Sequence, residues 1–122
     1  MDKSTTIELI DFILESIKLI NRRFKSIKSS DDFLDSDEGL DKLDAISMRI
    51  QAIGEALKNL YKREDELLLK VADKNYWSRI IKTRDFISHH YVDIDSETVF
   101  DICSNELKEL EIKVGEIKDF LK

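Results

Sequence analysis

An arginine, an aspartate, two histidines and a tyrosine lie within one short stretch of this chain, at Arg84, Asp85, His89, His90 and Tyr91. The planar guanidinium of an arginine donates paired hydrogen bonds that suit the oxygens of a phosphate group. Asp85 precedes His89 by one helical turn, so its carboxylate could hold the imidazole in one tautomer. The stretch could therefore bind an anion beside an oriented imidazole, whereas the simpler interpretation makes the two histidines cations that cap a helix end.

Arg84 interrupts the apolar face of the helix that must carry it. We expect this helix from about residue 75 to residue 90 or 91, with an inward face set by Trp77, Ile80, Ile81 and Ile87. At about 100° per residue, Arg84 falls in the middle of that face. Because an unpaired arginine in a core is costly, two interpretations stay open. Arg84 either forms an internal ion pair or faces a subunit interface or cleft, where it binds an anion such as phosphate.

The two histidines do not share the face of Arg84. On an unbroken helix that puts Arg84 at about 340°, His89 lies at about 120° and His90 at about 220°. A single straight helix therefore does not join Arg84 to His89. Either the helix unwinds and turns His89 back, or a second copy of the chain completes the site.

The charge balance limits how this chain could hold a polyanion. Among 122 residues, 20 lysines and arginines stand against 26 acidic residues, which gives a net charge of −6. A general polycationic grip on nucleic acid is therefore disfavoured, and any contact with RNA must be local. Lys74, Arg79, Lys82 and Arg84 form a small positive patch that suits one or a few phosphates, and Arg79, Lys82 and His90 are the candidate contacts to RNA phosphates. For Lys74 and Arg79 the alternative is a solvated helix face.

Composition and spacing exclude several other classes of protein. The absence of proline and the single cysteine rule out a disulfide-stapled scaffold and a zinc site made of thiolates, so Cys103 is expected to be a buried, inert thiol. The aspartates of residues 31–38 lack the spacing of a calcium-binding loop and indicate a solvated connection. No apolar run could span a membrane and the N-terminus lacks a secretory leader, which predicts a cytoplasmic protein. We expect no metal and no cofactor.

The length and the apolar periodicity predict one all-α domain over residues 1–122. The expected helices cover about residues 5–29, 40–61 and 75–91, and a fourth runs from Asp95 to about Leu121. Residues 63–74 are ambiguous and favour a single helical turn before a bend. No stretch alternates apolar and polar residues long enough to predict a strand. The expected architecture is an antiparallel four-helix bundle, with a fifth, short helix as the variant.

Local signals refine the expected ends and crossings of these helices. Thr5 and Glu8 have the spacing of a capping box at the first helix, and Asp95 can cap the fourth. Ile94 and Val99 have the spacing of a hydrophobic staple there. Gly54, inside the second helix, is either tolerated at a cost of about 1 kcal/mol or marks a close crossing by another helix.

The segment RDFISHHY, residues 84–91, resembles the signature of HEPN-domain ribonucleases of the HepT type. That signature runs Arg, Asn or Asp, three variable residues, His, any residue and Tyr. Residues 49–56 (RIQAIGEA) resemble the second helix of the family, Trp77 precedes the motif as in its members, and Ile94 and Asp95 follow it. The resemblance covers most of the chain from about residue 39 to residue 121.

Two features depart from this pattern. Many relatives carry a proline before the tryptophan, and the connection before Trp77 has none. His90 fills a variable position of the signature, so the proton-transfer role stays open between His89, which we favour, and His90.

The resemblance implies a small helical bundle that acts as a homodimer, with the motifs of two subunits meeting in a cleft. It also implies a metal-independent endoribonuclease in which the RNA's own 2′-hydroxyl is the nucleophile. Carried over to this chain, His89 would move the proton, Arg84 would stabilise charge on the phosphate oxygens, and Asp85 would orient them.

The resemblance further implies a toxin–antitoxin pair. HepT-like toxins are paired with an MntA-like nucleotidyltransferase antitoxin that attaches AMP to the motif tyrosine, which is Tyr91 here. The alternative function is a non-catalytic HEPN dimer that binds such a nucleotidyltransferase or a nucleotide. The simplest alternative is a structural helical dimer in which Arg84 pairs across the interface.

Overall fold

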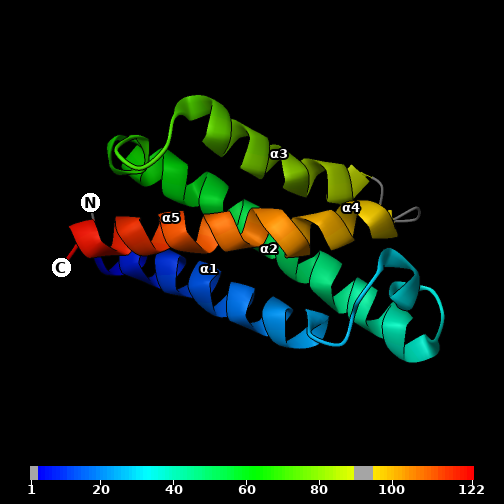
Figure 1. Cartoon of the computed structure of the whole chain (residues 1–122). Helices are drawn as coiled ribbons and strands as arrows, with labels where there is room; N and C mark the ends of the chain where they lie inside the picture. Colours follow the sequence, from blue (N-terminus) through cyan, green and yellow to red (C-terminus); the bar gives the residue numbers. More distant parts are fainter. Residues whose placement is uncertain (1–2, 90–94) are drawn as a thin grey trace.

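The computed structural model describes residues 3–89 and 95–122, with side chains described for residues 4–83 and 95–122. The described chain is helical throughout its long elements and contains no strand, which confirms the all-α prediction (Figure 1). The elements are α1 (Lys3–Phe24), the short 3-10 helix η1 (Ser30–Phe33), α2 (Asp37–Leu69), α3 (Lys74–His89), α4 (Ser96–Asp101), the π-helical turn η3 (Ile102–Glu106) and α5 (Leu107–Phe120). No helix of the described residues has the length and apolar character that a membrane crossing requires.

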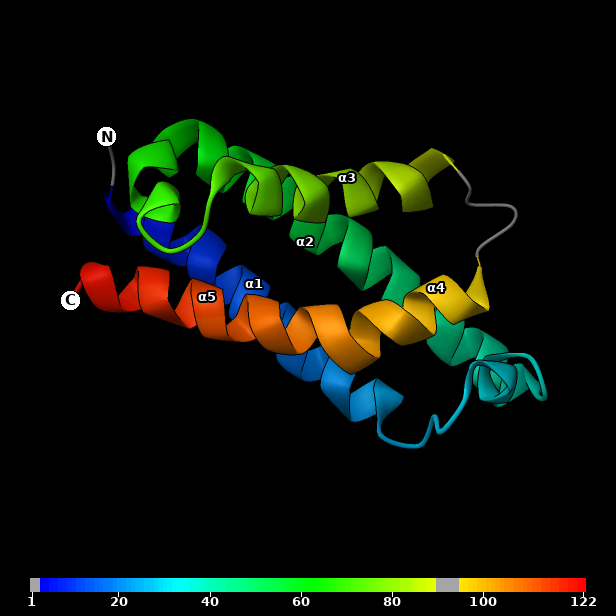
Figure 2. The same ribbon diagram turned by 45° about the horizontal axis from the view of Figure 1, so that its top comes forward.

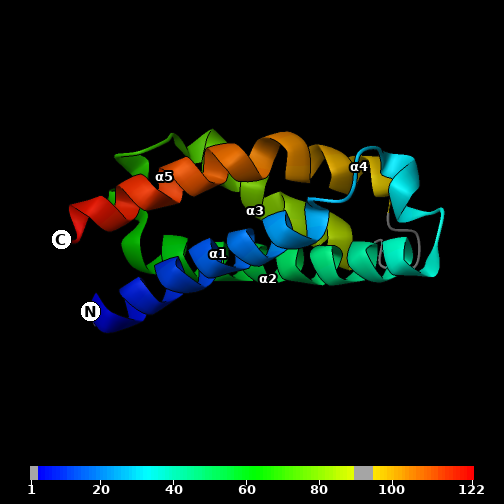
Figure 3. The same ribbon diagram turned by 60° about the horizontal axis from the view of Figure 1, so that its bottom comes forward.

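Four helical arms form an antiparallel bundle, because α4, η3 and α5 follow one another as a single arm. α2 is the central element and contacts both α1 and α3, while α5 lies along α1 (Figure 2). Figure 3 shows α1 crossing α2 on the side of the bundle away from α3. α1 and α3 run in the same direction, so their C-terminal ends lie at the same end of the bundle (Figures 1 and 3).

The core is made largely of apolar residues that recur every three or four positions along the predicted helices. Ile10, Ile17 and Ile20 of α1 are fully buried, and Ile13, one turn from Ile17, joins them. The stripe of the last arm is also buried, at Val99, Ile102, Leu107, Leu110, Val114 and Ile117. Burial of an aliphatic side chain contributes about 1.5–3 kcal/mol, so these two stripes hold α1 and the last arm together.

The predicted start and end of the first helix are wrong. Thr5 lies inside α1, which already begins at Lys3, so Thr5 is not the N-cap. The helix ends at Phe24 and not near residue 29, in a turn where the Ile27 amide donates to the Phe24 carbonyl oxygen at 2.9 Å. The early end has a physical reason, since the turn buries Ile27, which a longer α1 would carry away along its axis.

The acidic connection after α1 is more ordered than the prediction of a solvated loop. It contains η1, whose Phe33 is fully buried and lies with its ring centroid 6.3 Å from that of Phe24. The Asp32 carboxylate accepts hydrogen bonds from the backbone amides of Lys28 and Ser29, at 2.7 and 3.3 Å. One of the aspartates in this cluster therefore serves to fold the connection.

The second helix extends beyond its predicted range in both directions. It begins after Ser36, whose hydroxyl accepts a hydrogen bond from the Gly39 amide at 3.0 Å. It continues to Leu69 through a kink at Glu64, where φ is −137° and ψ is 41°. The ambiguous segment is thus a further helical piece after the kink, and the expected bend follows it.

Replacing either of two glycines by alanine is expected to change stability in opposite directions. A Cβ at Gly39 would lie 2.2 Å from the Asp32 carbonyl oxygen and 3.0 Å from that of Phe33, both backbone atoms of the packed connection. We therefore expect Gly39→Ala to lower the free energy of unfolding by about 2 kcal/mol through overpacking. A Cβ at Gly115 would meet nothing within 4 Å. Gly115→Ala is expected to raise the free energy by about 0.5–1 kcal/mol, because alanine favours the helix.

Urea unfolding followed by circular dichroism measures both changes. Equal effects of the two alanines, in either direction, would contradict the close approach at Gly39.

The start of the last arm confirms the predicted cap. The Asp95 carboxylate accepts from the Glu97 amide at 3.0 Å and from the Thr98 hydroxyl at 2.9 Å, and the bond from Thr98 is the larger cause of its lowered pKa. Ile94 lies outside the described residues, so the staple stays a prediction. Farther along, Cys103 is buried as expected, and burial raises the pKa of its thiol to about 12.

Candidate active site

The beginning of α3 is fixed against the end of α2. The Asp73 carboxylate accepts from the Tyr76 amide at 2.8 Å in the first turn of the helix. Trp77 is fully buried, and its indole Nε1 donates to the carbonyl oxygens of Leu68 and Ala72, at 2.9 and 3.1 Å. Because the indole is buried and its N–H group is hydrogen-bonded, Trp77 fixes the rotation of α3 about the helix axis.

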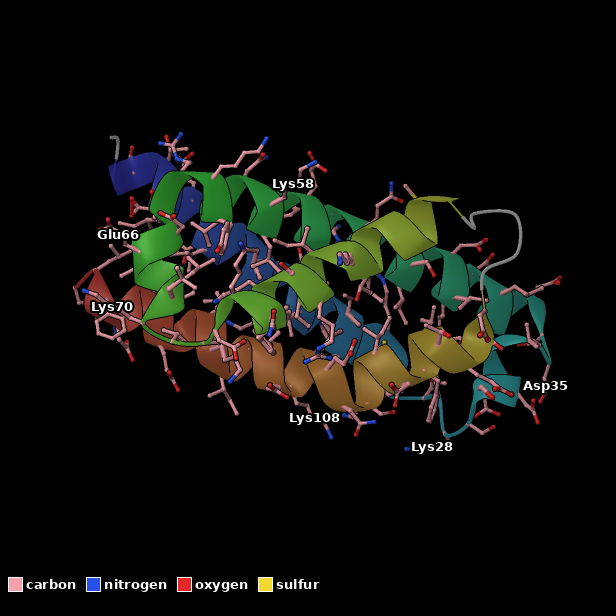
Figure 4. All side chains as sticks on the ribbon, turned by 90° about the horizontal axis from the view of Figure 1, so that it is seen from above. Lys28, Asp35, Lys58, Glu66, Lys70 and Lys108 are labelled. Carbon is pink, nitrogen blue, oxygen red and sulfur yellow. The ribbon has the colours of Figure 1, made fainter. Side chains whose placement is uncertain are left out.

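The inward face of α3 is the predicted one as far as its side chains are described. Trp77 and Ile80 are buried, and in Figure 4 α3 lies between α2, which carries Lys58, and α5, which carries Lys108. Gly54 is buried in α2 and lines a small apolar cavity with Ile80 and other residues of the three helices.

Three of the predicted site residues lie in the last turns of α3. The backbone is helical through Arg84, Asp85 and His89, while His90 and Tyr91 lie outside the described residues. The described backbone therefore does not unwind before His89. The five-residue separation of these two positions on a helix corresponds to about 140°.

A groove lies next to this part of α3. It has a volume of about 230 Å³ and runs between α3 and the start of the last arm. Its described lining consists of Thr83, Thr98, Asp101, Ile102 and Glu106. The π-helical turn supplies two of these residues, Ile102 and Glu106, and π-helical turns occur often at functional sites.

The charges beside the groove are partly neutralised. Arg79 donates to the Glu106 carboxylate at 2.9 Å, and its guanidinium lies 5.5 Å from the centroid of the Tyr76 ring. Burial is the main cause of the raised pKa of the Tyr76 hydroxyl, and the Glu109 carboxylate adds to it. Lys82 is exposed and has no ion pair with any described residue. Among the described side chains, Lys82 is therefore available to an incoming phosphate, whereas Arg79 must leave or share Glu106.

The sequence did not indicate the groove or the role of Glu106. Arg79 and Glu106 are 27 residues apart, and neither the periodicity nor the motif relates them. The sequence likewise did not indicate the π-helical turn that carries Ile102 and Glu106. In the described part of the chain, no three His, Cys, Asp or Glu side chains are placed to hold a metal ion.

The fold and this motif define a small all-α domain with an arginine, an aspartate and a histidine near the end of its third helix. The chain belongs to the HepT-like ribonuclease family, since the family model described as "Ribonuclease HepT-like" matches residues 13–117. Ribonuclease activity of the HEPN type is therefore the activity that its family indicates.

A curated relative supports the same assignment. A Methanocaldococcus jannaschii protein, named for gamma-glutamylcyclotransferase activity and for a proposed RNase activity, is 30% identical over 112 residues. The match covers 92% of this chain and 47% of the relative, so the chain spans about half the length of that protein. No solved structure matches the chain.

Proposed function

We propose that this protein is a metal-independent endoribonuclease that works as a homodimer and as the toxin of a toxin–antitoxin pair. The observation that carries the proposal is the match to the ribonuclease family together with the segment RDFISHHY at the end of α3. The substrate is RNA, and neither a metal nor another cofactor takes part.

The motif residues divide the reaction between them. The 2′-hydroxyl of a ribose attacks the adjacent phosphorus, the bond to the 5′-oxygen of the next nucleotide breaks, and a 2′,3′-cyclic phosphate remains. His89 moves the proton between the attacking and leaving oxygens, because imidazole populates both protonation states near neutral pH. Arg84 stabilises the charge on the phosphate oxygens, and Asp85 orients the imidazole. His90 is the alternative proton carrier.

A second subunit completes the site in this proposal. Helical spacing separates Arg84 and His89 by about 140° on one chain, so a phosphate held by the arginine of one subunit is served by the histidine of the other. Helical backbone through His89 supports this arrangement over a local unwinding. Arg79, Lys82 and His90 are the candidate contacts to neighbouring phosphates.

The antitoxin in this proposal is an MntA-like nucleotidyltransferase. It transfers AMP from ATP to the Tyr91 hydroxyl oxygen and releases pyrophosphate. The added phosphate places negative charge and bulk beside the arginine that binds RNA, which blocks the substrate.

Cleavage in the presence of a chelator tests the catalytic part of the proposal. The purified chain in excess EDTA is expected to cut single-stranded RNA and to leave 2′,3′-cyclic phosphate ends, which mass spectrometry of the products identifies. Cleavage that stops in EDTA and returns with a divalent ion would contradict metal independence. Binding of RNA without any cleavage would instead support the non-catalytic dimer.

Modification of Tyr91 tests the regulatory part separately. Coexpression with a nucleotidyltransferase of this type is expected to add AMP-sized masses to the chain and to abolish cleavage. Tyr91→Phe is expected to stay unmodified and to keep cleaving, because it lacks only the acceptor hydroxyl. A Tyr91→Phe chain that still gains AMP would overturn the assignment of the acceptor.

A further inference from the structure

The end of α1 concentrates positive charge on an otherwise acidic protein. Residues 18–28 contain five cations and no acidic residue, whereas the whole chain has a net charge of −6. The five are Lys18, Arg22, Arg23, Lys25 and Lys28. They lie on the last turns of α1 and just beyond it, where the negative end of the helix dipole also favours cations.

A groove between α1 and α2 lies beside these cations. It has a volume of about 330 Å³ and is lined by Arg23, Ala45, Met48, Arg49 and Ala52, which we name the arginine groove. Figure 3 shows the side of the bundle where α1 crosses α2. The two arginines are half-buried and its described lining includes no acidic residue, so the groove combines an apolar floor with two guanidinium groups.

An aromatic side chain adjoins the arginine groove. The Arg49 guanidinium lies 5.9 Å from the centroid of the Phe12 ring, and Phe12 is 40% exposed. Met48, in the groove itself, is 63% exposed. Exposed apolar and aromatic groups next to cations are the elements with which proteins bind single-stranded nucleic acid.

Three cations of this surface have no ion pair in the described part of the chain. Lys18, Arg22 and Arg23 form no ion pair with any described residue, in contrast to Arg79 and Lys118, which pair with Glu106 and Asp11. Holding unpaired like charges close together is unfavourable for the isolated protein. A polyanionic ligand would remove that cost.

We propose that the arginine groove, with Arg22 beside it, binds a single-stranded segment of the RNA substrate outside the cleavage motif. Its arginines bind backbone phosphates through their paired donors, while a base rests against Met48 and Phe12. RNA is favoured over an acidic protein because the surface pairs cations with a ring suited to stacking, and because an acidic chain can grip a polyanion only locally. The inference rests on the proposed ribonuclease function.

The position of the groove suits this role. α1 and α3 run in the same direction, so the basic end of α1 and the motif end of α3 lie at the same end of the bundle (Figures 1 and 3). α1 lies on the side of α2 away from α3, so a strand that reaches both sites must be longer than the few nucleotides at the cleavage site. The groove should therefore matter for long RNA and not for short RNA.

Binding of an uncleavable RNA tests the inference independently of catalysis. The probe is a fluorescent RNA of about 16 nucleotides with 2′-O-methyl groups, which cannot supply the attacking hydroxyl. For the triple variant Arg22→Gln, Arg23→Gln, Arg49→Gln we expect about tenfold weaker binding in anisotropy titrations. The slope of log affinity against log salt is expected to fall by about 2, since each single-strand phosphate contact contributes about 0.7.

A charge-matched variant is the control. Lys62→Gln, Lys70→Gln, Lys122→Gln removes three exposed cations elsewhere, and Figure 4 shows Lys70 at the end of the bundle away from the start of α4. We expect binding within about twofold of the original chain and little change in salt slope. Equal losses in both variants, or none in the arginine variant, would overturn the inference.

Cleavage assays separate this inference from the proposed function. The arginine variant is expected to cut a tetranucleotide as fast as the original chain and a long RNA more slowly below saturation. If the original chain binds RNA but never cuts it, the ribonuclease proposal fails while the groove remains. The triple variant is uninformative if it has lost its helical circular dichroism, and the single variant Arg22→Gln, on an exposed side chain, is then measured. If Arg22→Gln does not change RNA binding, the double variant Arg22→Glu, Arg23→Glu provides the test. Unchanged binding by a folded double variant overturns the inference.

Discussion

RNA cleavage by Arg84→Ala and by His89→Ala is expected to fall by about 100- to 10,000-fold relative to the original chain. The arginine loss removes stabilisation of charge that develops only in the transition state, so the rate falls while RNA binding weakens modestly. The histidine loss removes proton transfer between the two oxygens. Single-turnover cleavage of a saturating RNA measures both rates directly and separates them from binding.

Three further variants make this expectation specific. Lys82→Ala, on an exposed side chain just before the motif, is expected to change the rate by less than about tenfold, because it contributes one phosphate contact. His90→Ala should cleave nearly normally if His89 carries the proton, and the reverse result would move that role to His90. Arg84→Lys keeps the charge but not the paired donors, so it should recover only part of the rate. Normal cleavage by both Arg84→Ala and His89→Ala, in folded protein, would remove the motif from the active site.

Mixed dimers can report on the shared cleft. A chain carrying Arg84→Ala and a chain carrying His89→Ala each lack one half of the proposed constellation. When the two are combined, some dimers regain one intact pair contributed by different subunits. Recovered cleavage would support a composite site, whereas two inactive chains that stay inactive after mixing would favour a site within one subunit.

Apolar periodicity predicted the helices that carry large buried side chains. It did not predict the helix ends that tertiary contacts determine. The stripe of the last arm and the Trp77–Ile80 face of α3 follow directly from spacing, and Asp95 caps where its side chain predicts. The end of α1 depends on burial of Ile27 and Phe33, which lie on either side of a turn that local propensity does not specify. The extension of α2 beyond a kink at Glu64 likewise depends on packing, as the full burial of Leu68 shows.

The candidate site also has a part that local patterns predict and a part that depends on tertiary contacts. The motif is a pattern of neighbouring residues, so the order of the amino acids is enough to reveal it. The ion pair of Arg79 with Glu106, and the arginine groove, join residues that are more than 20 positions apart, and local patterns carry no such information. What the fold adds is therefore the surroundings of the motif, namely which of the described cations already form an ion pair and which have no described partner.

Trp77→Ala is expected to lower the free energy of unfolding by about 4 kcal/mol, the largest effect on stability that the described core predicts for one residue. The indole is fully buried, lies edge-on to Tyr76 at 5.0 Å between ring centroids, and donates to two carbonyl oxygens in the bend after α2. Trp77→Phe keeps a ring but leaves those carbonyl oxygens without this donor, so we expect a smaller loss of about 1–3 kcal/mol.

The phenylalanine variant also connects the core to the motif. Because the indole sets the rotation of α3 about its axis, Trp77→Phe should slow RNA cleavage in protein that is still folded, since small misplacements of catalytic groups are costly. Urea unfolding by circular dichroism and single-turnover cleavage measure the two effects in the same preparation. Ile112→Ala, at a side chain that is 65% exposed on α5, is the control and should change stability by less than about 0.5 kcal/mol. A stable, fully active Trp77→Phe protein would mean that the hydrogen bonds of the indole do not position the motif, and that its apolar surface alone suffices.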